Sequence, residues 1–146
     1  AYARGNLSFG IGVADSDNAD PTPLFNVAYS IEGVRSNLSF RAFQNVYEDQ
    51  DNRETKRSGL SASYVSQINN VSSWETSLDF GRTERLTGLQ EITDRTIFDI
   101  AYRHALTAEW DLRAAYRHQL FAGNIRSTET TRKVTLSIDR SFFGLR

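Results

Sequence analysis

Apolar and polar residues alternate one by one along most of this chain, and this period of two argues against a helical fold. In the first such segment Leu7, Phe9, Ile11 and Val13 are separated by small or polar residues. Successive side chains of a β-strand point to opposite faces, so each segment has one apolar and one polar face. Eight segments show this alternation and are expected to be strands: 7–14, 25–31, 37–42, 60–64, 74–80, 98–103, 110–117 and 134–142.

The connections between these segments alternate in length. Three are tight, at 32–33, 69–72 and 107–109, and four are longer and polar, at 15–23, 48–56, 82–95 and 123–132. Pro21 and Pro23 fall in the first long connection, where they would interrupt no ladder of hydrogen bonds. Short connections join antiparallel neighbours, so we expect a single domain over residues 1–146, an eight-stranded up-and-down meander. Such a meander normally closes into a barrel, because closure removes unpaired edges.

The composition of the chain argues against several classes of protein. The 17 basic residues are balanced by 18 acidic ones, for a formal net charge of −1, which argues against a broadly basic nucleic-acid binder. The absence of cysteine excludes a disulfide framework and a thiolate zinc site. No apolar run approaches the ~18 residues of a membrane helix, so any membrane crossing would use strands. We expect no cofactor and no metal.

The polar positions of the strands indicate which face points inward. A soluble carrier barrel would turn its apolar face inward, whereas an outer-membrane barrel turns it toward lipid. Most polar positions here hold small residues, which suit the crowded interior of an eight-stranded barrel. Buried charges need partners, so we predict an ion-pair network that closes the lumen, with Asp99 beside Arg117 and Asp139 beside Arg113. Its members are Arg41, Glu75, Asp79, Asp99, Arg103, Arg113, Arg117 and Asp139.

Bulky aromatic residues gather at one predicted end of the strands. Trp74 and Trp110 each follow a tight connection, and Phe142 ends the last strand at the same end. Aromatic side chains at one rim of an apolar face are typical of a girdle at a membrane interface. Together these features predict a transmembrane β-barrel.

With these features the chain resembles the small eight-stranded outer-membrane β-barrels of Gram-negative bacteria, along its whole length and through architecture rather than a motif. The last strand, Val134-x-Leu136-x-Ile138-x-Arg140-x-Phe142, is similar to the C-terminal signal read by the barrel-assembly machinery, although Arg140 breaks its apolar series and four residues follow. The resemblance implies the bacterial outer membrane, its lipid and lipopolysaccharide as partners, and a structural, anchoring or surface-loop interaction role that includes possible protein partners.

Arginines dominate the basic residues of the third and fourth long connections. A guanidinium group matches a phosphate group in a bidentate manner, so these arginines are candidates for contacts with lipopolysaccharide. They are Arg82, Arg85, Arg95, Arg126 and Arg132.

No catalytic set stands out in the sequence, and we do not expect an enzyme. The two histidines, His104 and His118, are placed at opposite ends of neighbouring strands, too far apart to share a metal ion or a proton. The sequence shows no serine–histidine–carboxylate set, paired-carboxylate site or phosphate-binding loop. A lipid-modifying enzyme is therefore an alternative for which the sequence offers no catalytic residues.

A second alternative is a wider pore or secretion conduit. The eight strands would then be part of a larger single-chain barrel, or one subunit of an oligomeric one. Its signs would be a polar face that lines water and a first and last strand that do not pair with each other.

Overall fold

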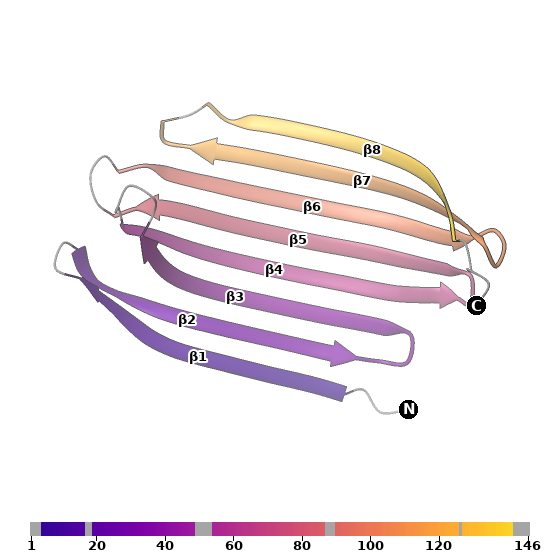
Figure 1. The fold of residues 1–146 in the computed structure, drawn as a ribbon, viewed down its shortest axis with the longest axis horizontal. Coiled ribbons are helices and arrows are strands. Elements are labelled where there is room, and N and C mark those ends of the chain that lie inside the picture. The colour runs from indigo at the N-terminus through magenta and orange to yellow at the C-terminus, as the bar shows by residue number, and fades with distance from the viewer. Residues whose placement is uncertain (1–3, 17–18, 49–53, 87–89, 126, 142–146) are drawn as a thin grey trace.

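The computed structural model describes residues 4–16, 19–48, 54–86, 90–125 and 127–141. These residues form one antiparallel sheet of eight strands, in which each strand lies beside its neighbours in sequence (Figure 1). The all-β up-and-down meander predicted from the alternation is thereby confirmed. The strands are β1 (Arg4–Ser16), β2 (Ala19–Glu32), β3 (Ser36–Glu48), β4 (Glu54–Asn69), β5 (Ser72–Arg85), β6 (Ile92–Ala105), β7 (Trp110–Gly123) and β8 (Glu129–Arg140).

The tight connections lie together at one end of the sheet, on the right of Figure 1, as predicted. The long connections are shorter than predicted. The ladder of β5 and β6, for example, continues through Thr83 opposite Thr93 to Glu84 opposite Ile92. Toward this end polar residues occupy both faces, so the alternation disappears from the sequence while backbone pairing persists. The strands consequently reach well beyond the apolar segments that predicted them.

The placement of the two prolines in a connection is wrong. Pro21 and Pro23 lie within β2, and Pro23 is opposite Val13 of β1. The ladder between β2 and β3 begins only at Phe25, so neither proline has to donate a backbone hydrogen bond to β3. At this point the Nε2 atom of Gln44 donates a hydrogen bond to the carbonyl oxygen of Pro23, at 2.7 Å.

The predicted closure into an eight-stranded barrel is also wrong. Within the described residues β1 pairs only with β2 and β8 only with β7, so the sheet is open and has two edges. An eight-stranded barrel is only just wide enough for its interior side chains. The polar face of this sheet carries Phe43 and Phe121 in addition to its arginines, and a closed lumen would have to enclose these side chains.

The sheet has little conventional core. Among the described residues, the buried apolar side chains are Ile97 and Ala101, and both lie on the polar face. Thr55, on the same face, is also buried. The apolar residues of the opposite face are exposed or half-exposed. The polar face is therefore the sheltered one, and we call it the inner face and its opposite the outer face.

Candidate functional site

The register of the sheet aligns the apolar positions of successive strands on the outer face. Each apolar stripe therefore continues that of the neighbouring strand instead of standing alone. In β2 to β5 several large outer residues are still 37–42% exposed although strands flank them on both sides. We call this continuous apolar surface of the outer face the apolar band. One row of opposite residues across it consists of Leu7, Tyr29, Phe40, Ala62, Leu78 and Phe98.

Aromatic side chains border the apolar band at the end with the tight turns. Trp74 contacts Tyr102 edge to face, with ring centroids 6.0 Å apart. The guanidinium group of Arg140 lies 5.2 Å from the ring centroid of Trp110, and it forms an ion pair with Glu109 at 3.0 Å. Trp74 and Trp110 thus occupy the rim predicted for them. Phe142, the third predicted member of the girdle, lies outside the described residues.

A hydrogen-bonded cluster at this rim was missed in the sequence. The Oγ atom of Ser72 lies 2.8 Å from Nδ1 of His104, and the hydroxyl of Tyr102 donates a hydrogen bond to Ser72 Oγ at 3.1 Å. Ser72 is buried. Tyr102 and His104 are two residues apart on one face of β6, and Ser72 is opposite His104. The register of the hairpin was the signal that could have found the cluster.

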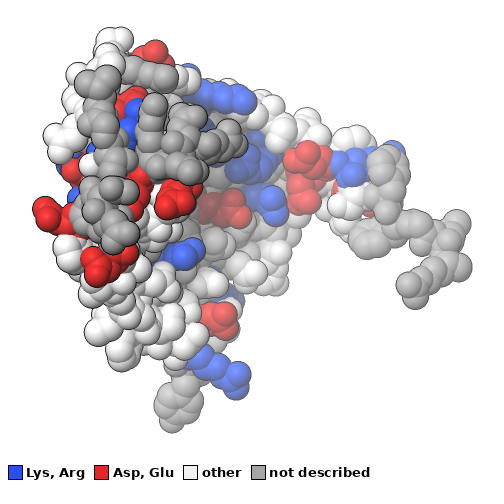
Figure 2. All heavy atoms as spheres, turned by 60° about the vertical axis from the view of Figure 1, so that its left-hand side comes forward, with Lys and Arg blue, Asp and Glu red and all other residues white. Residues whose placement is uncertain are grey.

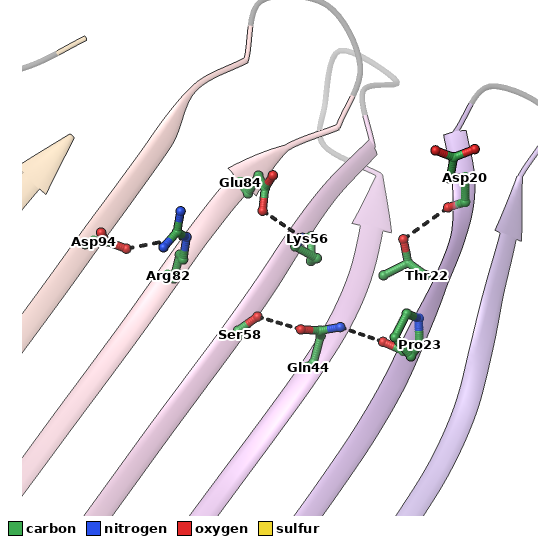
Figure 3. A network of polar contacts seen from close by, with 9 residues as sticks. All are labelled: Asp20, Thr22, Pro23, Gln44, Lys56, Ser58, Arg82, Glu84 and Asp94. Carbon is green, nitrogen blue, oxygen red and sulfur yellow. Dashed lines mark hydrogen bonds and ion pairs between the residues drawn. The ribbon is translucent and has the colours of Figure 1, made fainter. Parts of the chain in front are cut away.

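Ion pairs border the apolar band at the end with the long connections. Lys56 Nζ lies 2.7 Å from a carboxylate oxygen of Glu84, which joins β4 to β5. Arg82 Nε lies 3.9 Å from Asp94, which joins β5 to β6 at a distance too long for a hydrogen bond. All four side chains lie on the same face as the apolar residues, the outer face. We call this group of polar residues the polar belt. Figure 3 shows the belt, which also includes Gln44, Ser58 and Pro23.

The eight charged residues predicted to fill a lumen all lie on the inner face. Of the two predicted neighbouring pairs, Asp99 and Arg117 are opposite each other, as predicted. Arg117 binds both carboxylate oxygens of Asp99, from Nε at 2.6 Å and from Nη2 at 3.1 Å. The Arg117 side chain is nevertheless 55% exposed, because the open sheet does not enclose it. On the side of the molecule drawn in Figure 2, acidic and basic groups lie interspersed.

The other predicted members form no further ion pair with one another within the described residues. Arg113 is opposite Arg103 on β6 and Ser137 on β8, whereas Asp139 is opposite Asp111. The predicted contact of Asp139 with Arg113 is therefore diagonal rather than direct. These charges line an open surface, and nothing in the described part of the chain plugs it.

The inner face also holds cation–aromatic contacts. The guanidinium of Arg41 lies 5.3 Å from the ring centroid of Phe43 and donates a hydrogen bond to Asn26 Oδ1 at 3.3 Å. The Phe43 ring covers Gly59 so closely that a Cβ atom there would lie 2.5 Å from it. The glycine therefore makes room for the ring.

The five arginines predicted to bind lipopolysaccharide are not brought together. Arg82 and Arg85 each lie within ion-pair distance of a carboxylate, at 3.9 and 3.1 Å. Arg95 and Arg132 lie on opposite faces of the sheet. Arg126 lies outside the described residues.

The structure does not bring the two histidines together. His104 and His118 are opposite Leu112 and Phe98 respectively, toward different ends of the sheet. No three His, Asp or Glu side chains in the described ranges gather to hold a metal ion. The described chain has no helix of the length and apolarity needed to cross a membrane. Comparison of the chain with known protein families, with curated proteins and with solved structures finds no match.

Proposed function

We propose that this chain forms an eight-stranded section of the wall of an outer-membrane β-barrel that is wider than eight strands and encloses a water-filled pore or conduit. The observation that carries the proposal is the open two-faced sheet, with an apolar band outside, charged residues inside and two free edges.

The outer face supports a position in lipid. Along β5 the apolar band extends from Trp74 to Arg82, a separation of eight residues. At ~3.3 Å per residue this distance is about 26 Å along the strand. A strand tilt of ~40° reduces it to about 20 Å, a little less than the ~25 Å apolar band of outer-membrane barrels. Aromatic rings at one border and ion pairs at the other suit the two interfaces with water.

The two edges support a wider ring. An unsatisfied backbone group in hydrocarbon costs several kcal/mol, so only closed barrels cross membranes as strands. β1 and β8 do not close this sheet on itself. Additional strands must therefore pair with both edges, and the resulting lumen has room for water around exposed charges such as Arg117.

Single-channel recording in planar bilayers tests the proposal with two matched variants. Ser61 lies on the inner face between Arg41 and Asp79, and its neighbour Ala62 lies on the outer face between Phe40 and Leu78. We expect stable conductance steps from the refolded chain, a reduced step for Ser61→Trp and an unchanged step for Ala62→Trp. A refolded and inserted chain that gives no steps would contradict the pore, as would equal effects of the two variants.

A further inference from the structure

The edge strand β1 lacks, along most of its length, the charges and prolines by which proteins usually protect such edges. β1 has 13 residues, and between Gly5 and Ala14 it contains no charged residue and no proline. β8 has 12 residues and no proline, but five of its residues are charged: Glu129, Arg132, Lys133, Asp139 and Arg140. A long edge strand without charges or prolines is a template for pairing with another strand. The edge of β1 is therefore suited to recruit a partner strand.

Side-chain exposure rises sharply at these edges. The outer residues Phe9 of β1 and Leu136 of β8 are 77% and 70% exposed, whereas Leu78 in the middle of the sheet is 41% exposed. All three occupy the same apolar band. The difference corresponds to the side-chain surface that a neighbouring strand would cover, and an apolar partner in register with these residues would bury it.

The two edges are complementary to each other in direction and in pattern. β1 runs from the end with the tight turns toward the end with the long connections, and β8 runs the opposite way (Figure 1). When residues 4–14 are set antiparallel to residues 129–139, every outer position meets an outer position. Inner positions meet inner ones in the same way, and a basic residue at one end meets an acidic one. The pairs include Arg4 with Asp139, Leu7 with Leu136, Ser8 with Thr135 and Phe9 with Val134.

We infer that β1 of one copy of this chain pairs with β8 of a second copy in this register, with Arg4 opposite Asp139. We call this contact between β1 of one copy and β8 of the other the seam. Each copy has both edges, so two copies related by a twofold axis along the barrel form two identical seams and a ring of sixteen strands. Pairing within one chain would use the same register, but it would enclose Phe43, Phe121 and the inner arginines in an eight-stranded lumen. Sixteen strands leave an aqueous channel. This inference rests on the proposed function, since it names the partner that completes the pore wall.

Disulfide cross-linking tests the seam without interference from native cysteines, because the chain has none. The variants are Ser8→Cys/Thr135→Cys and Asn6→Cys/Ser137→Cys, two inner-face pairs of the inferred ladder that are separated by the pair Leu7 and Leu136. Opposite residues of an antiparallel ladder have Cα separations of either ~5.5 or ~4.5 Å, and both distances lie within the range that a disulfide bridges. The refolded chain in lipid vesicles is oxidised and its mass is measured under denaturing, non-reducing conditions.

We expect a disulfide-linked product of twice the 16.5 kDa chain mass from the double variants and none from Thr135→Cys alone. The control pair Ser63→Cys/Ser77→Cys, whose members are opposite in β4 and β5, should form an intrachain disulfide. An intrachain disulfide in the seam variants would show closure with eight strands and overturn the inference. A ladder of larger products, dimers from Ser8→Cys alone, or no product while the control oxidises would also overturn it.

Carbonate extraction of the same vesicles separates this inference from the proposed function. A chain that stays in the lipid but does not form the twofold product refutes only the seam between copies. A chain that is extracted from the lipid refutes the membrane wall as well.

Discussion

The variant Leu78→Arg tests whether the outer face contacts hydrocarbon. Leu78 lies on β5, four residues from Trp74 and four from Arg82. At ~3.3 Å per residue it is therefore about 13 Å along the strand from each border of the apolar band. Its cross-strand neighbours are Ala62 and Phe98, so no carboxylate is directly opposite.

The expected cost follows from this central position. An arginine that faces lipid near the bilayer midplane destabilises a transmembrane barrel by about 2–4 kcal/mol, and the cost falls toward the interfaces. The matched control is Ser77→Arg, one residue away on the inner face and opposite Asp99. An arginine on a solvated face usually changes stability by no more than about 0.5 kcal/mol. The two adjacent variants should therefore differ by at least about 1.5 kcal/mol.

Denaturant unfolding in lipid vesicles measures this difference. Fluorescence of the two native tryptophans, Trp74 and Trp110, reports the transition without a label. Leu78→Arg should lower the midpoint clearly, and Ser77→Arg should leave it near that of the unmodified chain. Equal midpoints for the two variants, or a larger loss for Ser77→Arg, would refute the assignment of the outer face to lipid.

Two further substitutions test local packing by the same unfolding assay. Gly59→Ala should cost about 1–3 kcal/mol, because its Cβ would lie 2.5 Å from the Phe43 ring. Gly81→Ala, with no atom within 4 Å of its Cβ, should cost less than Gly59→Ala, and equal losses would count against the packing. Ser72→Ala should cost about 1 kcal/mol by removing the hydroxyl beside His104, and an unchanged midpoint would count against that cluster.

The strands and their faces were predictable from the sequence because the side-chain period of a strand is fixed by geometry. All eight segments coincide with strands, the last of them as far as Arg140, and the alternation assigned Leu78 and Ser77 to opposite faces. It failed where polar residues occupy both faces, and there backbone hydrogen bonds extend the ladder without a signal in hydropathy. Pro23 was misplaced for this reason.

The alternation of apolar and polar residues could not predict whether the sheet closes or which side chains are partners. Whether a meander closes depends on strand tilt, stagger and the volume of interior side chains such as Phe43, none of which a two-residue period contains. Partners depend on register, and a slip of two residues preserves both faces. The alternation therefore could not separate an opposite pair such as Asp99 and Arg117 from the diagonal pair Arg113 and Asp139.

Water accessibility along β5 tests the two-faced wall most directly. Single cysteines at positions 76, 77, 78 and 79 replace Thr76, Ser77, Leu78 and Asp79, and each variant in lipid vesicles reacts with a charged maleimide. We expect rapid labelling at 77 and 79, which face the inner side, and protection at 76 and 78, which face the outer side. Uniform labelling of the inserted chain, or labelling at 76 and 78 alone, would contradict a wall with lipid outside and water inside.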